Sequence, residues 1–325
     1  MSKTIPPLRF KPQFQYRLWG GGKLKTKLNK NCKDEGIGES WEISAVDGFP
    51  SVIEDGPWKG KTLPEMIAAF PEAILGKKCI ANYGNTFPLL IKFIDARLPL
   101  SVQVHPNDEL AKMRHNANGK NEMWYILDAD PDAELILGFN QNIDAEQYAK
   151  LLAEGRIEEV LHREKVTAGD VVNVPAGLIH AIGGGVLLAE IQQSSDVTYR
   201  VYDFNRIDAK TGETRGLHTN EAIDALDFSA HKKHKINYSK DLNRVNTILK
   251  TAYFTTAFLP IEGAYPMDYS KRAAFSILIC IEGTVTVRSN DHILSLEKGQ
   301  CVLIPAALNE VVFQGKAQLL DVTVL

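Results

Sequence analysis

The feature that most constrains the fold of this chain is a strand–turn–strand pattern that occurs twice. Residues 168–182 read AGDVVNVPAGLIHAI, and residues 298–312 read KGQCVLIPAALNEVV. In both copies an apolar run leads into a Pro-Ala turn, and a second run returns from it. Two copies of one β-unit are typical of a chain that builds two similar β-barrels in tandem. The second copy has Glu310 at the position of His180.

The rest of the chain also favours strands, with a few helices between them. Short apolar runs broken by Gly and Pro dominate both ends of the sequence. Capping signals, such as Thr62 with Glu65 and Asp144 with Gln147, indicate where helices begin. We therefore expect a mainly β protein of two jelly-roll barrels in tandem, with a small helical insertion. The helices are predicted near residues 62–76, 143–163 and 219–228.

Bulk composition argues against several classes of function. The 325 residues carry a formal net charge of −3, which favours neither nucleic acid nor an anionic membrane as a partner. No run approaches the roughly 18 apolar residues that a membrane helix needs, and MSKTIPPLRF contains no apolar signal-peptide region. The four cysteines form neither a CxxC motif nor a disulfide framework. We expect a cytoplasmic protein with a small-molecule partner, as a monomer or small homo-oligomer.

Three segments bring potential metal ligands into the strand pattern. In LSVQVH, Gln103 and His105 are two residues apart and share one face of a strand. In GKNEMWYIL, Lys120 and Glu122 also share a face, and His180 follows the Pro-Ala-Gly turn. Two imidazoles, an amide and a carboxylate form a donor set suited to Zn²⁺ or another divalent first-row metal. Such a site is a Lewis acid that can polarise a carbonyl or hold an oxyanion.

These motifs together resemble type I mannose-6-phosphate isomerase in its short bacterial form, within the cupin superfamily. The resemblance rests on IGESWEIS, LSVQVHPND, GKNEMWYI, VPAGLIHAIGGG and QQSSDVTYRVYDFNR, which occur in this order. It implies two cupin-type barrels and one zinc ion per chain, in an enzyme that interconverts mannose 6-phosphate and fructose 6-phosphate. The first histidine of the usual cupin pair is replaced here by Gln103. The implied ligands are Gln103, His105, Glu122 and His180, and the implied essential arginine is Arg200.

An aldose–ketose isomerase moves a proton between C1 and C2 through an enediolate, so it needs charge stabilisation, a base and a phosphate site. Arg200 is always cationic and can stabilise the enediolate or clamp a substrate oxyanion. Glu190 lies in the apolar strand VLLAEIQQ, where a carboxylate is either the proton shuttle or an ion-pair partner. Lys120, Ser101 and Lys92 are further candidates for contacts with phosphate or sugar oxygens.

The C-terminal copy of the β-unit lacks the ligands of the first. We therefore expect residues 1–240 to form the catalytic barrel and residues 241–325 to form a degenerate barrel without metal. Two other classes of function remain open. One is a cupin metal-dependent oxygenase, and the other is a non-catalytic sugar-phosphate-binding protein. The identity of the metal separates the isomerase from the oxygenase, and turnover separates it from the binding protein.

Overall fold

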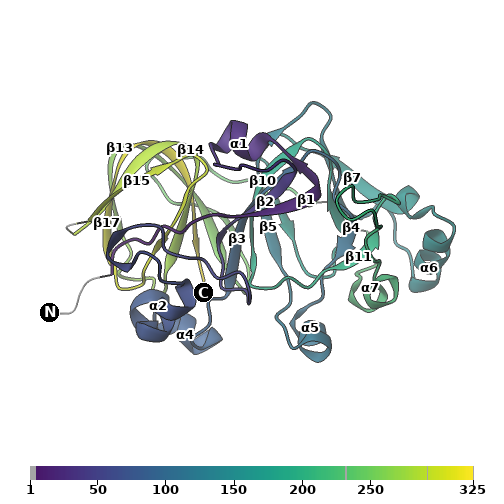
Figure 1. Cartoon of the computed structure of the whole chain (residues 1–325), viewed down its shortest axis with the longest axis horizontal. Helices are drawn as coiled ribbons and strands as arrows, with labels where there is room; N and C mark the ends of the chain where they lie inside the picture. Colours follow the sequence, from purple (N-terminus) through teal and green to yellow (C-terminus); the bar gives the residue numbers. More distant parts are fainter. Residues whose placement is uncertain (1–4, 231–232, 291, 325) are drawn as a thin grey trace.

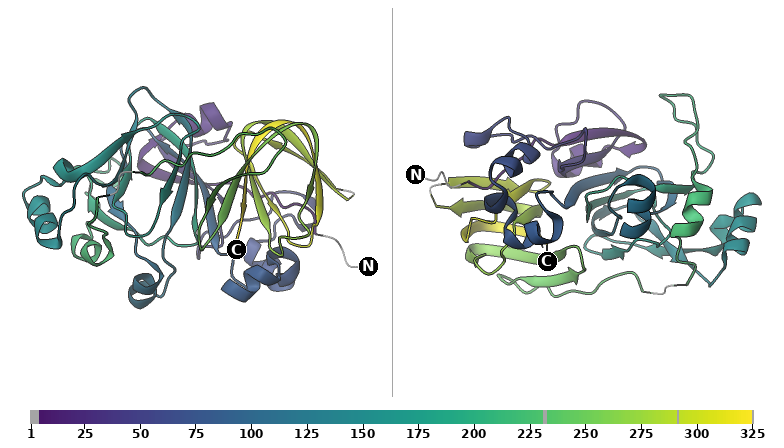
Figure 2. Two further views of the ribbon diagram at one scale, coloured as in Figure 1. Left: turned by 180° about the vertical axis from the view of Figure 1, so that it is seen from behind. Right: turned by 90° about the horizontal axis from the view of Figure 1, so that it is seen from below.

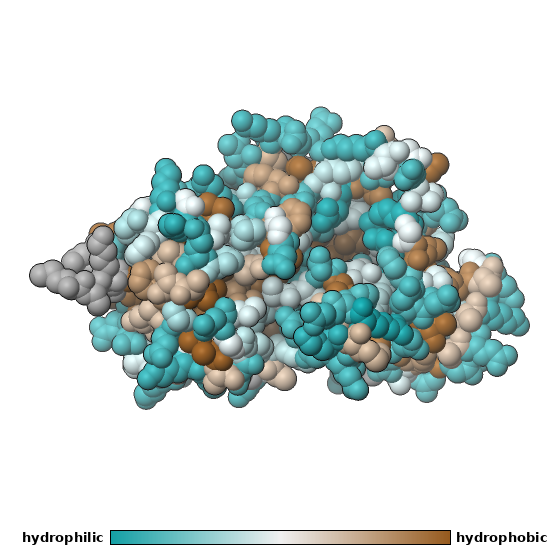
Figure 3. Space-filling view, turned by 60° about the horizontal axis from the view of Figure 1, so that its bottom comes forward, coloured by the Kyte–Doolittle hydropathy of each residue, from teal (hydrophilic) through white to brown (hydrophobic). Residues whose placement is uncertain are grey.

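The computed structural model of the chain describes residues 5–230, 233–290 and 292–324. Within these residues the fold is mainly β, with three sheets and short helices at the periphery (Figure 1). No helix in the described residues is both long and apolar enough to cross a bilayer. The face shown in Figure 3 is mostly hydrophilic, and its hydrophobic residues form small groups rather than one large patch.

The N-terminal unit contains two sheets that face each other. The strands of the first, in spatial order, are β1 (Gln13–Gly21), β2 (Ile37–Ile43), β3 (Leu89–Ala96), β10 (Val186–Gln193), β5 (Glu122–Ala129) and β8 (Val171–Val174). Those of the second are β11 (Tyr199–Tyr202), β4 (Val102–Val104), β9 (His180–Ile182), β6 (Glu134–Phe139) and β7 (Leu161–Lys165). An apolar cluster that includes Leu100, Trp124 and Leu188 fills part of the space inside this unit.

The C-terminal unit is one curled sheet of long strands. Its strands, in spatial order, are β12 (Asn246–Lys250), β13 (Thr255–Asp268), β17 (Glu310–Thr323), β14 (Ser276–Ser289) and β15 (His292–Glu297), and β16 (Cys301–Ile304) pairs with β14. The interior of this unit is lined by aliphatic and aromatic side chains such as Leu278, Val302 and Phe313. These strands form a sheet of their own, but the division of the chain at residue 240 remains a prediction.

The duplicated pattern of the sequence is one structural unit used twice. Between β8 and β9, the amide of Leu178 donates to the carbonyl of Pro175 at 3.2 Å. Between β16 and β17, the amide of Leu308 donates to the carbonyl of Pro305 at 2.9 Å. The fold is cupin-like, as predicted. Hydrogen bonding among the described strands does not close any of the three sheets into a continuous barrel.

The helices lie outside the sheets. They are α1 (Lys23–Leu28), α2 (Leu63–Ala69), α3 (Pro71–Leu75), α4 (Lys77–Tyr83), α5 (Asp108–His115), α6 (Ala145–Ala153) and α7 (Thr219–Ala225), with 3₁₀ turns at Gly56–Trp58 and Ile157–Val160. The helical segment expected near 143–163 is shorter than predicted, because β7 begins at Leu161 and pairs with β6. The sequence analysis did not predict α1, α4 or α5.

Helices of the N-terminal unit also join the two units. The amide of Lys78 donates to the carbonyl of Ala273 at 3.1 Å, and the amide of Ala306 donates to the carbonyl of Ile74 at the same distance. The rings of Phe87 and Phe275 lie 4.9 Å apart in an apolar cluster that contains residues of both units. Figure 1 shows α2 and α4 beside the C-terminal sheet. The two units therefore share one continuous apolar interface.

Candidate metal centre and substrate pocket

Strand register places the polar residues of the N-terminal unit in two rows, one on each sheet. On the first sheet, Trp41 of β2 is opposite Lys92, and Lys92 is opposite Glu190, which is opposite Trp124. On the second sheet, Arg200 is opposite Gln103, and Gln103 is opposite His180. Cross-strand neighbours on one face lie about 5 Å apart. Register thus brings together side chains that are almost 100 residues apart in the sequence, such as Lys92 with Glu190 and Gln103 with Arg200.

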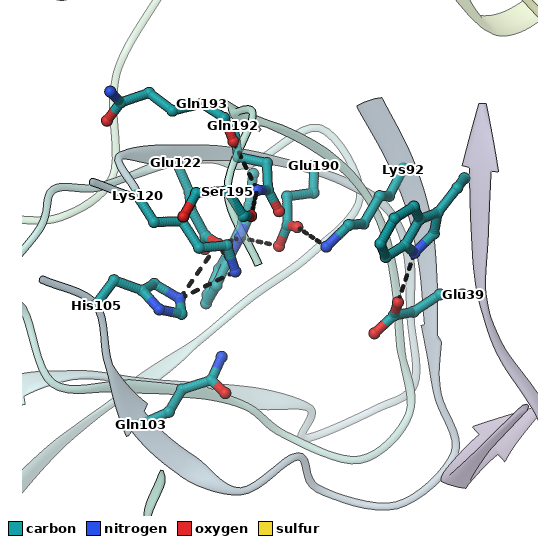
Figure 4. Close-up of polar contacts among 12 residues, drawn as sticks. Glu39, Lys92, Gln103, His105, Lys120, Glu122, Glu190, Gln192, Gln193 and Ser195 are labelled. Carbon is teal, nitrogen blue, oxygen red and sulfur yellow. Dashed lines mark hydrogen bonds and ion pairs between the residues drawn. The ribbon is translucent and has the colours of Figure 1, made fainter. Parts of the chain in front are cut away.

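Three buried side chains from these sheets form a group with the geometry of a metal site. One ligand atom from each of His105, Glu122 and His180 lies within 4.8 Å of the other two, and each residue is only 1% exposed. Nε2 of His105 is 3.3 Å from Oε1 of Glu122, and Nε2 of His180 is 4.0 Å from Oε2. Nε2 of Gln103 is 3.3 Å from Nε2 of His180. All four predicted ligands therefore converge on one place (Figure 4 shows three of them).

The two histidines are oriented by backbone carbonyls. Nδ1 of His105 is 3.0 Å from the carbonyl oxygen of Val197, and Nδ1 of His180 is 2.8 Å from that of Leu178. A carbonyl only accepts, so each Nδ1 carries the proton and each Nε2 offers its lone pair toward the group. Burial lowers the pKa of His105 to about 3 and also lowers the pKa of His180, so both rings are neutral at physiological pH. Neutral imidazoles in this tautomer are metal ligands.

Lys120 is the cation next to this group. Its Nζ lies 2.6 Å from Oε1 of Glu122 and 3.2 Å from Nε2 of His105. Burial opposes ionisation of Glu122, but the charge of Lys120 outweighs it and holds the pKa of this carboxyl well below its usual value. Burial likewise opposes the charge of Lys120, and Glu122 with Glu190 raises its pKa above the usual value. A carboxylate and an ammonium are therefore both charged in the interior.

A second buried carboxylate, Glu190, lies beside the first. The indole Nε1 of Trp124 is 3.1 Å from Oε2 of Glu122 and 3.1 Å from Oε2 of Glu190, so it bridges the two carboxylates. Oε1 of Glu190 lies 3.2 Å from Nζ of Lys92. Burial and the nearby charge of Glu122 raise the pKa of Glu190. The two carboxylates thus have opposite pKa shifts, an arrangement that assigns different acid–base roles to two similar groups.

A cavity of about 450 Å³ lies between the two sheets beside the metal group. Its size suits a small metabolite rather than a macromolecule. Six of the predicted site residues line it, and they are Lys92, Ser101, Gln103, Lys120, Glu190 and Arg200. His105, Glu122 and His180 do not line it themselves but contact Gln103 and Lys120, which do. The sequence-predicted residues thus form one continuous site.

Arg200 is the cation of this pocket with the fewest partners. Its Nη1 donates to the carbonyl of Gly216 at 2.8 Å, whereas its buried Nε has no hydrogen-bond partner among the described residues. Burial and the neighbouring charge of Arg215 lower its pKa, but a guanidinium starts from such a high value that it remains charged. Lys92 and Lys120, by contrast, already contact carboxylates. The pocket therefore has its least compensated positive charge at Arg200.

Several residues in and next to the pocket were not predicted from the sequence. Glu39 of β2 accepts a bidentate pair of hydrogen bonds from Arg17, at 3.1 and 3.0 Å, and a further one from the indole of Trp41 at 2.8 Å. Burial opposes its charge, but Lys92 and Arg17 lower its pKa to about 2. Trp124 shares its strand face with Glu122 and Lys120, a signal that the period-2 pattern already contained. No comparable pattern in the sequence indicated that Arg17 and Arg215 line the pocket.

Comparisons with known proteins give a consistent result. Residues 8–139 match the family model described as phosphomannose isomerase type I, catalytic domain, and residues 244–324 match mannose-6-phosphate isomerase, cupin domain. Mannose-6-phosphate isomerase ManA of Bacillus subtilis is 37% identical over 319 residues, which cover 97% of this chain and 98% of the relative. Mannose-6-phosphate isomerase of Streptococcus mutans is 33% identical over 315 residues, 97% of each chain.

The solved structures agree with the sequence matches. The crystal structure of mannose 6-phosphate isomerase from Bacillus subtilis superposes with a TM-score of 0.89 at 31% identity, covering 98% of this chain and 99% of the other. A mutant of phosphomannose isomerase from Salmonella typhimurium has a TM-score of 0.82 at 18% identity, covering 98% of this chain and all of the other. At that identity the second structure demonstrates a shared fold only.

Proposed function

The chain belongs to the type I phosphomannose isomerase family, and from this premise we propose that it interconverts mannose 6-phosphate and fructose 6-phosphate. The observation that carries the proposal is the buried group of His105, Glu122 and His180 beside a cationic pocket of metabolite size. A donor set for a Lewis-acid metal and a site for an anionic sugar lie side by side. Together they can hold a phosphorylated sugar and stabilise the negative charge that develops when a proton moves next to its carbonyl.

We propose one Zn²⁺ per chain, held by His105, Glu122 and His180 with Gln103 as a fourth ligand. The donor chemistry supports this assignment, since both histidines direct a neutral Nε2 toward an ionised carboxylate. When bound, the ion supplies positive charge that stabilises negative charge on the substrate oxygens. The C-terminal unit is proposed to bind no metal, and its interior is instead lined by apolar side chains.

Proton transfer through an enediolate is assigned to the buried carboxylate Glu190, with Lys120 as a second candidate. The raised pKa of Glu190 supports this role, since a general base works best when its pKa lies nearer the operating pH. The predicted alternative, an ion pair, is also present as the contact with Lys92. A base held by a lysine can still accept a proton, and the ion pair fixes its position.

A negatively charged group of the substrate, its phosphate or the developing enediolate oxygen, is proposed to bind at the Arg200 end of the pocket. The unpartnered Nε of Arg200 is a donor that an anion would satisfy, and a guanidinium binds phosphate oxygens in pairs. Ser101, which is buried and lines the same pocket, can add a hydroxyl donor. Lys92 and Lys120 remain proposed contributors to substrate binding, although in the structure each contacts a carboxylate.

The proposed reaction is tested by incubating the protein with mannose 6-phosphate in D₂O and following the sugar by NMR. We expect fructose 6-phosphate to form with deuterium at C1, because an enediolate exchanges its proton with solvent through the base. Oxygen consumption is recorded in parallel. Product without any deuterium would contradict solvent-exchanging proton transfer, and oxygen uptake without isomerisation would point to an oxygenase.

A further inference from the structure

The segment between β11 and α7 folds into a small hairpin that borders the pocket. Ile207 and Thr214 form a β-bridge, the amide of Asp208 donates to the carbonyl of Glu213 at 2.9 Å, and the amide of Gly212 donates to the carbonyl of Asp208 at 2.7 Å. In the right-hand view of Figure 2 a loop in the green of this region projects from the body of the molecule. Ile207 is 66% exposed, so the hairpin is not packed into a core.

The base of the hairpin is anchored, but its backbone is strained. The buried carboxylate of Asp203 accepts hydrogen bonds from Arg206 at 2.5 Å and from Arg215 at 2.5 and 2.8 Å. Between these residues, Phe204 and Asn205 have φ angles of 55° and 52°. Two consecutive residues with side chains in the left-handed region are unusual, and such strain clusters at segments that move or bind. The base of the hairpin is therefore held in place by the contacts of Asp203, and the turn at Phe204 and Asn205 next to it has the backbone strain expected of a hinge.

The hairpin also touches the opposite side of the pocket. The hydroxyl of Tyr16, on the outer strand β1, donates to Oδ1 of Asp208 at 3.1 Å. Nζ of Lys210 lies 3.5 Å from the centre of the Tyr16 ring, which is a close cation–π contact. Tyr16 and Asp208 both line the cavity. Their contact therefore joins two walls of the pocket, one from β1 of the first sheet and one from the segment that follows β11 of the second.

The hairpin is connected directly to Arg200. Arg200 donates from Nη1 to the carbonyl of Gly216, and its own carbonyl accepts from the amide of His218 at 2.7 Å. Arg215, one residue before Gly216, lines the pocket beside Arg200. A displacement of the hairpin would therefore move the Gly216 carbonyl, which accepts the hydrogen bond from Arg200. It would also move the guanidinium of Arg215.

We propose that residues 206–216 form a flap over the substrate pocket, and that Tyr16 and Asp208 are the latch that holds it closed. The flap rests on the proposed function for one point only, namely that the ligand bound in the pocket is a sugar phosphate. Closing the latch places Arg215 and the Gly216 carbonyl next to Arg200, which fixes Arg200 for the substrate. Tyr16 and Asp208 are positioning residues, because they act through the flap rather than on the reacting atoms.

The test compares the wild type with Tyr16→Phe and Asp208→Asn by hydrogen exchange and kinetics. Without substrate, amides of residues 206–214 should exchange faster in both variants than in the wild type, and fructose 6-phosphate should slow this exchange mainly in the wild type. KM for mannose 6-phosphate should rise about fivefold, the effect of losing one hydrogen bond, while metal content and Tm stay unchanged. Tyr238→Phe, which removes a hydroxyl bonded to the Gly169 carbonyl, is the matched control and should behave as wild type.

The outcomes separate the latch from the proposed function. If the amides of residues 206–214 exchange hydrogen at the wild-type rate in both variants, the proposed latch is wrong, whatever the substrate. Absence of isomerase activity in the wild type would overturn the proposed function, while the exchange measured without substrate would still decide the latch. A lower Tm or a lower metal content in both variants, together with lost activity, would show that Tyr16 and Asp208 have a merely structural role. That result would also overturn the proposal.

Discussion

Replacing His180 with alanine is expected to remove the bound metal and to lower kcat/KM by about 10³-fold or more, and His105→Ala should do the same. Each histidine contributes a neutral Nε2 to the buried group, so losing either one leaves a single imidazole ligand beside Glu122. Losing a Lewis-acid metal removes several kcal/mol of transition-state stabilisation, and each 1.36 kcal/mol corresponds to a factor of ten in rate. The measurement is metal content by mass spectrometry alongside a coupled isomerase assay.

The control for these two variants is His162→Ala. His162 is a half-buried histidine on β7, outside the metal group, so its loss should change neither metal content nor kcat/KM. Circular dichroism should show the same strand content in the wild type and in all three alanine variants. Full activity with metal still bound in either His105→Ala or His180→Ala would show that the ligand assignment is wrong.

The second large effect is expected at Arg200, where alanine should leave the metal in place and lower kcat by about 10²–10³-fold. This is the range seen when one preorganised donor to a developing oxyanion is removed. Within the part of the chain that the structure describes, the side chain makes one hydrogen bond, to the Gly216 carbonyl, so the fold should tolerate its loss. Arg200→Lys should give an intermediate rate, because a lysine keeps the charge but not the planar fork.

The matched control is Arg156→Ala. Arg156 is exposed and pairs with Glu154 and Glu159 on the surface, so this variant should retain wild-type kinetics. The two kinetic constants must be measured separately. A raised KM with unchanged kcat in Arg200→Ala would mean that Arg200 binds ground state and transition state equally, and would contradict a role in the chemical step.

Much of the metal group was predictable from sequence because its signal is local. Gln103 lies on β4 with His105 directly after that strand, and Lys120 lies two residues before Glu122, which begins β5. The strand period therefore predicts that each pair faces the same side. His180 follows a turn whose pattern repeats in the C-terminal unit, so its place at the start of a strand was also visible. That these segments meet at one point followed from the resemblance to a family rather than from periodicity.

What the sequence did not predict depends on long-range contacts. Helix α1 has no side-chain cap of its own, and its first amides, at Lys23 and Leu24, instead donate to the carboxylate of Asp95. Lys92 stays a predicted contact for phosphate or sugar oxygens, but its partner within the protein, Glu190, is fixed by the register of β3 and β10. Arg215 reaches the pocket only because Asp203 holds it there. Helix α5, by contrast, has a local Asn107 cap that could have predicted it.

The measurement that tests the central claim most directly is metal analysis of the purified protein together with the coupled mannose 6-phosphate assay. We predict about one zinc per chain, loss of turnover when a chelator removes it, and recovery when zinc is restored. His180→Ala, treated in the same way, should neither bind zinc nor recover. Full turnover by metal-free protein, or iron or manganese without isomerase activity, would contradict the proposed zinc isomerase and the roles assigned to Glu190 and Arg200.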